Sequence, residues 1–236
     1  MPAYLPPPDA GRRFTGRRRV RLADTDPQGR LRPDAVARYL QDVATDDWDD
    51  TGIDTGELWV VRRTAQRLAP GGAWPTLGTE ITVTTWCSGI GAAWAERRTD
   101  LAVAGVVQVQ TEALWVPLDA SGRPRRIQGG FRDAYEEASA GRKVSGRVQP
   151  AVVAHGTDRR PWPLRRVDLD VAGHVNNAAG WAPLVEVASG APMAEAVLTH
   201  HLPVEWGGPV ELATSPGRMW LLSADTVLVS ATYELS

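Results

Sequence analysis

The spacing of apolar side chains in the first part of the chain predicts a strand followed by a helix. Residues 17–22 alternate weakly between polar and apolar types, which predicts the strand. Pro33 fits the first turn of a helix, and Gly52 ends the helical pattern. Between these two residues the apolar side chains recur at nearly helical spacing, at Val36, Tyr39, Leu40, Val43 and Trp48.

Strand-like segments follow this predicted helix. Residues 79–86 alternate and are rich in β-branched types, and residues 92–103 and 106–116 extend the pattern. Residues 119–124 have the composition of a turn. One helix followed by several antiparallel strands is the element order of an α+β unit.

The same order then begins again. Residues 136–157 are largely small and polar and predict a linker, after which residues 162–167 predict a new strand. Asn176 or Asn177 is expected to cap a short helix. Further strands are predicted over residues 196–204, 210–214, 219–222 and 227–235.

These patterns predict an α+β fold with two domains, over residues 14–135 and 158–236. Neither predicted sheet alone would cover both its faces and its edges. We therefore expect the two halves to pack as a pseudo-dimer within one chain. A hydrophobic share of 43% is sufficient for the core of such a fold.

A short polar motif occurs near the start of each predicted domain. The first copy reads Asp-Thr-Asp-Pro-Gln-Gly-Arg and the second reads Asp-Leu-Asp-Val-Ala-Gly-His. Arginine is permanently charged, whereas histidine titrates near neutral pH, so only the second copy has a group suited to proton transfer. The aligned pairs are Asp24 with Asp168, Asp26 with Asp170, Gly29 with Gly173, Arg30 with His174, and Leu31 with Val175.

Charge and cysteine content restrict the possible functions. A formal net charge of −2 argues against general affinity for nucleic acid. Cys87 is the only cysteine, so the chain contains no internal disulfide, as is usual in a reducing cytosol. The N-terminus does not resemble a signal peptide, and no apolar run approaches the roughly 18–20 residues that span a bilayer. We expect a cytoplasmic protein with no membrane segment.

Arginine runs at residues 17–19, 125–126, 159–160 and 165–166 allow two interpretations. Such runs commonly form solvated surface. They can also form a docking patch for an acidic partner or a phosphate-bearing part of a substrate.

The second motif resembles the signature of hotdog-fold thioesterases. More closely, Asp168-Leu-Asp170-Val-Ala-Gly-His174-Val-Asn176-Asn177 is similar to that of the acyl-acyl-carrier-protein thioesterases of plants and bacteria, which are tandem double-hotdog chains. Residues 86–92 and 115–124 resemble further stretches of that family, and the resemblance covers roughly residues 14–236. It implies two domains, each an antiparallel sheet wrapped around a central helix. The first would bind the acyl chain and the second would be catalytic.

The resemblance also implies the site residues. The catalytic Asp of the family falls on Asp170 and its His on His174, and a further acidic position falls on Glu205. Two positions depart from the family pattern. Ala172 stands where an Asn is common, and Trp206 stands where plant members have a Cys, which excludes a simple Cys–His mechanism.

Thioester hydrolysis needs an activated nucleophile and hydrogen-bond donors for the developing oxyanion. Asp170 can act as general base or nucleophile, and His174 can orient groups or exchange protons. Asn176, with backbone amides at the start of the next helix, can receive the carbonyl oxygen. Structural alternatives stay open: Asp170 can cap its own turn, Asn176 can cap the helix, and Glu205 can be a surface carboxylate.

Other polar and aromatic residues have mainly structural interpretations. Asp168 is expected to fix the turn or pair with Arg166, and Cys87 is expected to be a small buried hydrophobe. His200 and His201 are neighbours on a predicted strand and would face opposite sides, so we expect no metal site. Most tryptophans suit core packing. We hypothesise that one or two of Trp48, Trp59 and Trp86 narrow an acyl tunnel.

These observations together predict a hydrolase of acyl thioesters that needs no cofactor and releases a free fatty acid. The expected substrate is an acyl-acyl-carrier protein. Three alternatives stay open, namely an acyl-coenzyme A thioesterase, a hotdog hydratase or dehydratase, and a non-catalytic module that binds acyl thioesters. Because an intrachain pseudo-dimer already satisfies the pairing of the fold, both a monomer and a homodimer are compatible with the sequence.

Overall fold

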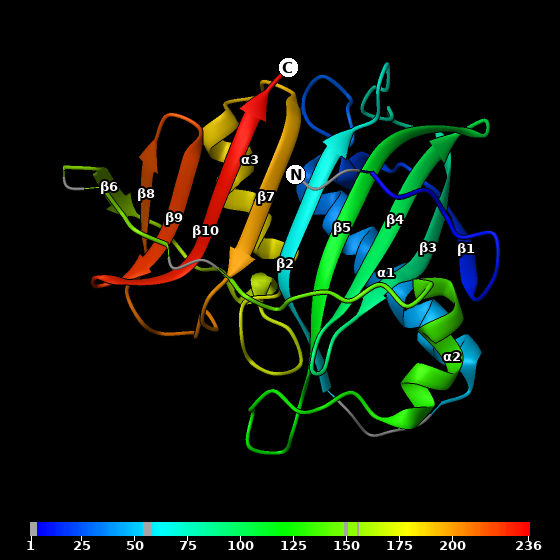
Figure 1. The fold of residues 1–236 in the computed structure, drawn as a ribbon. Helices are drawn as coiled ribbons and strands as arrows, with labels where there is room; N and C mark the ends of the chain where they lie inside the picture. The colour runs from blue at the N-terminus through cyan, green and yellow to red at the C-terminus, as the bar shows by residue number, and fades with distance from the viewer. Residues whose placement is uncertain (1–3, 54–57, 149–150, 155) are drawn as a thin grey trace.

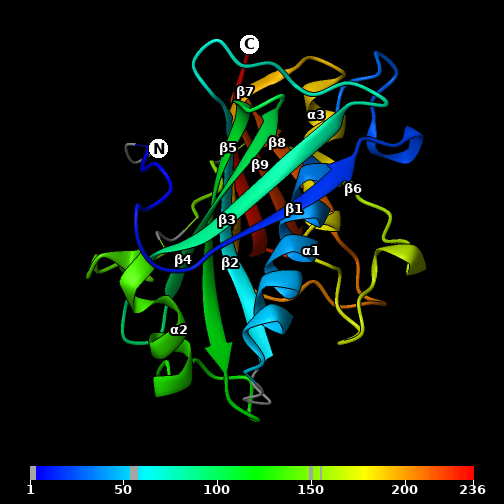
Figure 2. The same cartoon turned by 90° about the vertical axis from the view of Figure 1, so that its right-hand side faces the viewer.

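The computed structural model describes residues 4–53, 58–148, 151–154 and 156–236. Within them, all strands belong to one ten-stranded sheet in the order β1-β3-β4-β5-β2-β7-β10-β9-β8-β6. Figure 1 shows the five strands of the first half beside the five of the second half. Helices α1 and α3 lie on the same face of this sheet (Figures 1 and 2). The expectation of an α+β fold built from two sheet-and-helix halves is confirmed.

The first half contains two helices and five strands. A 3₁₀ turn at Leu22–Asp24 separates its first strand from its central helix. The elements are β1 (Arg13–Arg19), α1 (Pro33–Thr51), β2 (Leu58–Leu68), β3 (Glu80–Ile90), β4 (Ala95–Val103), β5 (Val106–Leu118) and α2 (Gly129–Ser139).

The second half repeats this order with shorter elements. A 3₁₀ turn at Arg166–Asp168 precedes a second one at Ala179–Trp181, which leads directly into α3. The remaining elements are β6 (Asp158–Pro161), α3 (Ala182–Ala188), β7 (Met193–His200), β8 (Glu211–Ser215), β9 (Arg218–Ser223) and β10 (Thr226–Leu235).

Helix α1 agrees with the sequence pattern at both ends. Pro33 occupies the first turn, where no backbone N–H is needed, and Gly52 ends the helix in the left-handed conformation at φ 66°. Its buried face includes Val36, Leu40 and Val43, which belong to one apolar core with residues of the second half. The helix therefore packs where the two halves meet.

The two halves join along β2 and β7. These strands pair antiparallel with Arg63 opposite Thr199 and Arg67 opposite Glu195, so neither half leaves this edge open. A side chain adds to the junction, since Trp74 donates its indole N–H to the carbonyl of Met193 over 2.9 Å. The expected intrachain pseudo-dimer is therefore present.

Three predicted strands differ from the observed ones, and one of them, predicted over residues 196–204, lies earlier, at Met193–His200. The first strand lies earlier than predicted, at Arg13–Arg19, because residues 22–24 form the 3₁₀ turn. The strand predicted over residues 162–167 is wrong. Here β6 ends at Pro161, and Pro163 has no N–H for a ladder, so the chain turns into the 3₁₀ segment at Arg166–Asp168.

Helix α2 spans the domain boundary expected at residue 135. It runs to Ser139 and packs on β3, and its Tyr135 donates a hydrogen bond to Asp47 on α1. The division into residues 14–135 and 158–236 with a linker over 136–157 stays a prediction. Residues 149–150 and 155 of that linker lie outside the described residues.

His200, at the end of β7, is a partly buried residue whose imidazole Nε2 atom is enclosed. This atom has no hydrogen-bond partner within the described residues, and the Cε1 atom lies close under Gly180. Burial, together with the nearby cation of Arg62, lowers the pKa of His200 from 6.5 to about 4.

We predict that replacing Trp74 by Phe weakens the junction between the halves. The substitution removes the indole donor and leaves the Met193 carbonyl without its partner, which should lower the free energy of unfolding by about 1–2 kcal/mol. Urea unfolding of the full chain measures this loss. Trp94→Phe is the matched control, because the Trp94 indole makes no hydrogen bond within the described residues, and an equal loss in both variants would contradict the prediction.

We also predict that His200 makes the fold sensitive to acid. Between pH 6.5 and 4 the unfolded chain binds a proton at this imidazole and the folded chain does not, so stability falls as the pH falls through this window. The full effect is about 3 kcal/mol. His200→Gln should reduce the difference between urea midpoints at pH 7.5 and pH 4.5. An undiminished pH dependence in His200→Gln would exclude this role.

Candidate active site

The repeated motif forms the same hydrogen-bonded turn in both halves. In the first copy, Asp26 N–H donates to the carbonyl of Arg30 over 2.8 Å, and in the second Asp170 N–H donates to that of His174 over 2.9 Å. Each turn passes through a glycine in the left-handed region, at φ 78° for Gly29 and 77° for Gly173. The sequence repeat is thus also a structural repeat.

Strand-like register places the two candidate catalytic residues opposite each other. Leu169 and Val175 form an antiparallel bridge, so the next pair inward is Asp170 and His174. Directly opposed residues have Cβ atoms about 4.5–5.5 Å apart and project to the same side.

The first copy shows the same placement with its side chains in contact. There Arg30 Nε donates to Asp26 Oδ2 over 2.8 Å. The second copy replaces this permanent cation by an imidazole at the same position.

Asp170 also takes the structural role that its position in a turn allows. Its Oδ1 accepts the N–H of Ala172 over 2.9 Å, and within the described residues no hydrogen bond joins its carboxylate to His174. Both side chains are half-buried. Asp170 therefore has a second carboxylate oxygen that the turn does not use.

Glu205 reaches the same place through the backbone. It forms an antiparallel bridge with His174, as Thr76 does with Arg30 in the first half. Glu205 is exposed to solvent, and so is its neighbour Trp206. The structure therefore brings three sequence-predicted residues, Asp170, His174 and Glu205, to one corner of the second half.

Asn176 contributes both to the helix start and to an open groove. Its Oδ1 accepts the N–H of Ala178 over 2.8 Å, which forms a local turn before the 3₁₀ segment. The prediction that Asn176 or Asn177 is the helix cap is wrong, because Ala178 takes the N-cap position of that segment. Its side-chain NH₂ donates to none of the described residues. Asn176 also lines a polar groove of about 650 Å³, together with Leu169 and Arg165.

Asp168 is structural, but its partner differs from the expected one. It accepts the backbone N–H of Arg165 and pairs with that residue's guanidinium at 2.6 Å, whereas Arg166 was the predicted partner. Arg166 instead lies over the ring of Trp206, with 5.0 Å between its guanidinium carbon and the ring centroid. The cation and the ring attract each other, which explains the change of partner.

Three neighbouring spaces lie one after another from the groove to the interior of the first half, and adjacent ones share a wall residue. Gln41 lines both the groove and a small cavity beside Asn177, and Trp115 lines both that cavity and a larger one of about 200 Å³. One face of α1 follows the whole series, with Ala37 at the small cavity and Trp48 at the large one. The distance between these two residues along α1 is about 16 Å.

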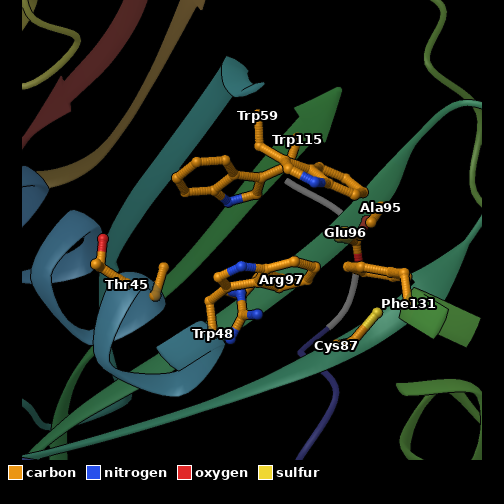
Figure 3. A pocket seen from close by; sticks show the side chains of 10 residues that line it. Thr45, Trp48, Trp59, Cys87, Ala95, Glu96, Arg97, Trp115 and Phe131 are labelled. Carbon is orange, nitrogen blue, oxygen red and sulfur yellow. The ribbon is translucent and has the colours of Figure 1, made fainter. Parts of the chain in front are cut away.

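The large cavity is lined mainly by aromatic rings (Figure 3). Trp59 and Phe131 stack with centroids 4.7 Å apart, and Trp48 lies 6.3 Å from Phe131. The sequence singled out Trp48 and Trp59 for such a place. Trp86, named with them, is fully buried on β3 and does not line this cavity. Trp115, which does, was not singled out.

Buried charges stand behind the aromatic lining, and sequence reasoning missed them. Arg97 of β4 pairs with Asp47 of α1 at 2.5 Å, and Asp47 also accepts the hydroxyl of Tyr135. Burial would lower the pKa of Arg97, but Asp47 raises it overall. Burial also raises the pKa of Cys87 to about 11, so this thiol stays protonated, and its expected burial is confirmed.

The candidate catalytic side chains stand beside these spaces rather than in their walls. Asp170, His174 and Glu205 line neither the groove nor the two cavities, while their neighbours Leu169 and Asn176 line the groove. Among the described residues no group of three His, Cys, Asp or Glu side chains is placed to hold a metal ion. Likewise, no described helix is long and apolar enough to cross a membrane.

Known proteins of this architecture include thioesterases from plants and bacteria. The fold matches the 12:0-ACP thioesterase of Umbellularia californica over 95% of this chain and 97% of that one, with a TM-score of 0.78 and 18% identity. It matches an acyl-ACP thioesterase of Bacteroides thetaiotaomicron over 95% and 98%, with a TM-score of 0.76 and 15% identity. These likenesses confirm the double-hotdog fold.

Sequence comparison identifies the family. An uncharacterized protein of Mycobacterium tuberculosis (strain H37Rv) is 26% identical over 218 residues, which cover 89% of this chain and 85% of that protein. The family model for the acyl-ACP thioesterase N-terminal domain matches residues 11–135, which is more than half of the chain. The chain therefore belongs to the acyl-ACP thioesterase family.

Proposed function

We propose that the protein hydrolyses acyl thioesters, with an acyl-acyl-carrier protein as substrate, and releases the free fatty acid. The observation that carries the proposal is the opposition of Asp170 and His174 at the turn beside the groove. Beyond that groove, a small cavity and the large aromatic cavity follow one another along α1 into the first half. The acyl chain would lie along α1, and its thioester carbon would remain near the second-half turn.

The proposed reaction uses the chain's own residues and one water molecule. Asp170 takes a proton from the water as its oxygen attacks the thioester carbon. Asn176 donates a hydrogen bond from its side-chain NH₂ to the carbonyl oxygen, which becomes negative. When the carbon–sulfur bond breaks, His174 supplies a proton to the departing sulfur. A fatty acid and a free thiol result, so atoms and charges balance.

Glu205 is proposed to position His174. Its backbone bridges that of His174, and its carboxylate stands at the site corner without a described partner. A hydrogen bond from one imidazole nitrogen to this carboxylate would orient the ring so that its other nitrogen faces the leaving thiol. Ala172 removes one carboxamide from the turn, so Asn176 would be the side-chain donor for the oxyanion.

The carrier and the location are part of the same proposal. Arg165 lines the groove, and with Arg166 it places two guanidinium groups near the proposed entrance, where they suit a carrier's acidic surface or phosphate. Coenzyme A shares that phosphate chemistry and is the alternative carrier. A cytoplasmic location agrees with the single, unpaired cysteine. The chain would act as a monomer or a homodimer.

A non-catalytic module that binds acyl thioesters is the second candidate. Its support is that Asp170 and His174 stand outside the walls of the spaces described above and that Asp170 serves its own turn. This candidate predicts tight binding of acyl chains without turnover.

We predict that Asp170→Asn and His174→Ala each lower kcat/KM for an acyl-carrier-protein thioester by about 10²–10⁴-fold, because each removes a proton-transfer group. Release of free thiol measures the rate. The internal repeat supplies a matched control, since Asp26→Asn alters the same turn in the copy that has no histidine. Each variant's urea midpoint shows that it is folded.

Parent rates in both second-half variants would contradict the catalytic proposal. If kcat/KM fell equally in the Asp26 and Asp170 variants, the cause would be disturbance of the fold and not loss of a catalytic group. Absence of thiol release from the parent protein, combined with acyl-chain binding, would favour the non-catalytic candidate.

We further predict that Trp48→Ala shifts the released fatty acids toward longer chains. The indole lines the large cavity, and its removal makes room for more methylene groups, each of which changes selectivity by about 10-fold or more. Profiling of fatty acids released from a mixture of chain lengths measures the shift. Trp94→Ala changes a tryptophan outside that cavity, and an identical profile in parent and Trp48→Ala would disprove the assignment.

A further inference from the structure

The large cavity contains two hydrogen-bond donors that have no acceptor. The indole nitrogens of Trp59 and Trp115 are both enclosed, and neither has a partner within the described residues. Both rings line the cavity, as Figure 3 shows. A buried N–H without a partner destabilises the folded protein, so such groups are rare in native structures.

Other tryptophans of the chain show that a pairing is possible in this fold. Trp74 is buried more fully than Trp59 and Trp115, and its indole N–H donates to a backbone carbonyl of the other half. The two orphaned donors therefore contrast with a satisfied one in the same protein. Moreover, they occur together, on the adjacent paired strands β2 and β5 and around the same space.

The acidic side chain in the wall is already engaged. Glu96 accepts hydrogen bonds from Ser88 Oγ and from the guanidinium groups of Arg98 and Arg142. Arg97, the other charged residue of the wall, is itself a donor and pairs with Asp47. Three donors converge on Oε1 of Glu96, and neither indole N–H donates to this carboxylate within the described residues, so the occupant of the cavity is the acceptor that we consider.

The aromatic part of the lining indicates that the rest of the occupant is apolar. Trp48, Trp59 and Phe131 present flat apolar surfaces, which suit a hydrocarbon chain. The large cavity lies beyond the small one when followed from Asn177, about seven residues or 10 Å further along α1. The acceptor therefore belongs near the distal end of an apolar chain.

We propose that the preferred acyl group carries an oxygen acceptor, such as a hydroxyl or keto group, near the end remote from the thioester. Trp59 and Trp115 are its specificity residues, and each donates its indole N–H to that oxygen. The inference rests on the proposed thioesterase function for its reaction, but the preference itself is a property of the cavity. A plain alkyl chain fills the same space and leaves both donors unpaired, which is the basis of the discrimination.

The test compares acyl-carrier-protein thioesters of equal chain length, one plain and one with a hydroxyl on the terminal carbon. Thiol release gives kcat/KM for each, and the full chain is used throughout. We expect a ratio of at least about 10 in favour of the hydroxylated chain, since a site built to hydrogen-bond a hydroxyl discriminates against the analogue without it. A ketone series with the oxygen moved along the chain should give its highest rate for a distal position.

Substitutions that each replace one Trp by Phe test whether the two indoles cause the preference. Trp59→Phe and Trp115→Phe should each lower the ratio about 10-fold. Trp94→Phe removes the same part of an indole at a position outside the cavity, so the ratio should stay within about twofold of the parent. Ratios are compared because the absolute rates of these cavity variants can all change.

A binding measurement separates this inference from the proposed function. Calorimetric titration with dodecanoic acid and with 12-hydroxydodecanoic acid needs no hydrolysis. Tighter binding of the hydroxy acid, abolished in Trp59→Phe and Trp115→Phe, supports the inference even if no thioester is cleaved. Hydrolysis with equal rates for plain and hydroxylated chains, or equal loss of the ratio in Trp94→Phe, would overturn the inference and leave the thioesterase proposal intact.

Discussion

The antiparallel pairing of β2 with β7 is the interaction on which the rest of the structure depends. Each half is a sheet of five strands, and this pairing turns the two inner edges into the middle of one sheet. It also places the start of α3 against α1, so that Trp181 and Leu40 share one core. Without it, the turn with Asp170 would have no route to the cavity of the other half, because that route runs along α1.

The two halves have diverged around this shared junction. Helix α1 has 19 residues, whereas its counterpart is a 3₁₀ turn followed by the 7 residues of α3. The long helix provides one face for the whole series of spaces, and the short one leaves room for Asn177 at their entrance. The two repeated turns differ in the opposite way, because here the first half has the purely structural version. The first keeps an ion pair between Asp26 and Arg30, which fixes a structure, and the second has an imidazole that can exchange protons.

Local patterns predicted what depends on local interactions. The limits of α1 follow from Pro33 and Gly52, and the repeated turn follows from hydrogen bonds between residues a few positions apart. Strand β2 was missed because Arg62, Arg63 and Arg67 interrupt its apolar pattern, although these side chains find partners across the sheet. The cavity was only partly predictable, since its lining comes from α1, four strands and α2, and only the fold brings them together.

In the proposed function, the residues for the reaction and the residues for its selectivity therefore lie in different parts of the chain. The turn with Asp170 and His174 needs only a short segment and one neighbouring bridge to keep its geometry. The cavity, in contrast, depends on distant residues such as Trp59, Trp115 and Phe131, each free to change without altering the turn. A chain can therefore keep the family's reaction and still acquire a different acyl group. The orphaned indole donors are the mark of such a change, because a cavity selected only for plain hydrocarbon would have no reason to bury them.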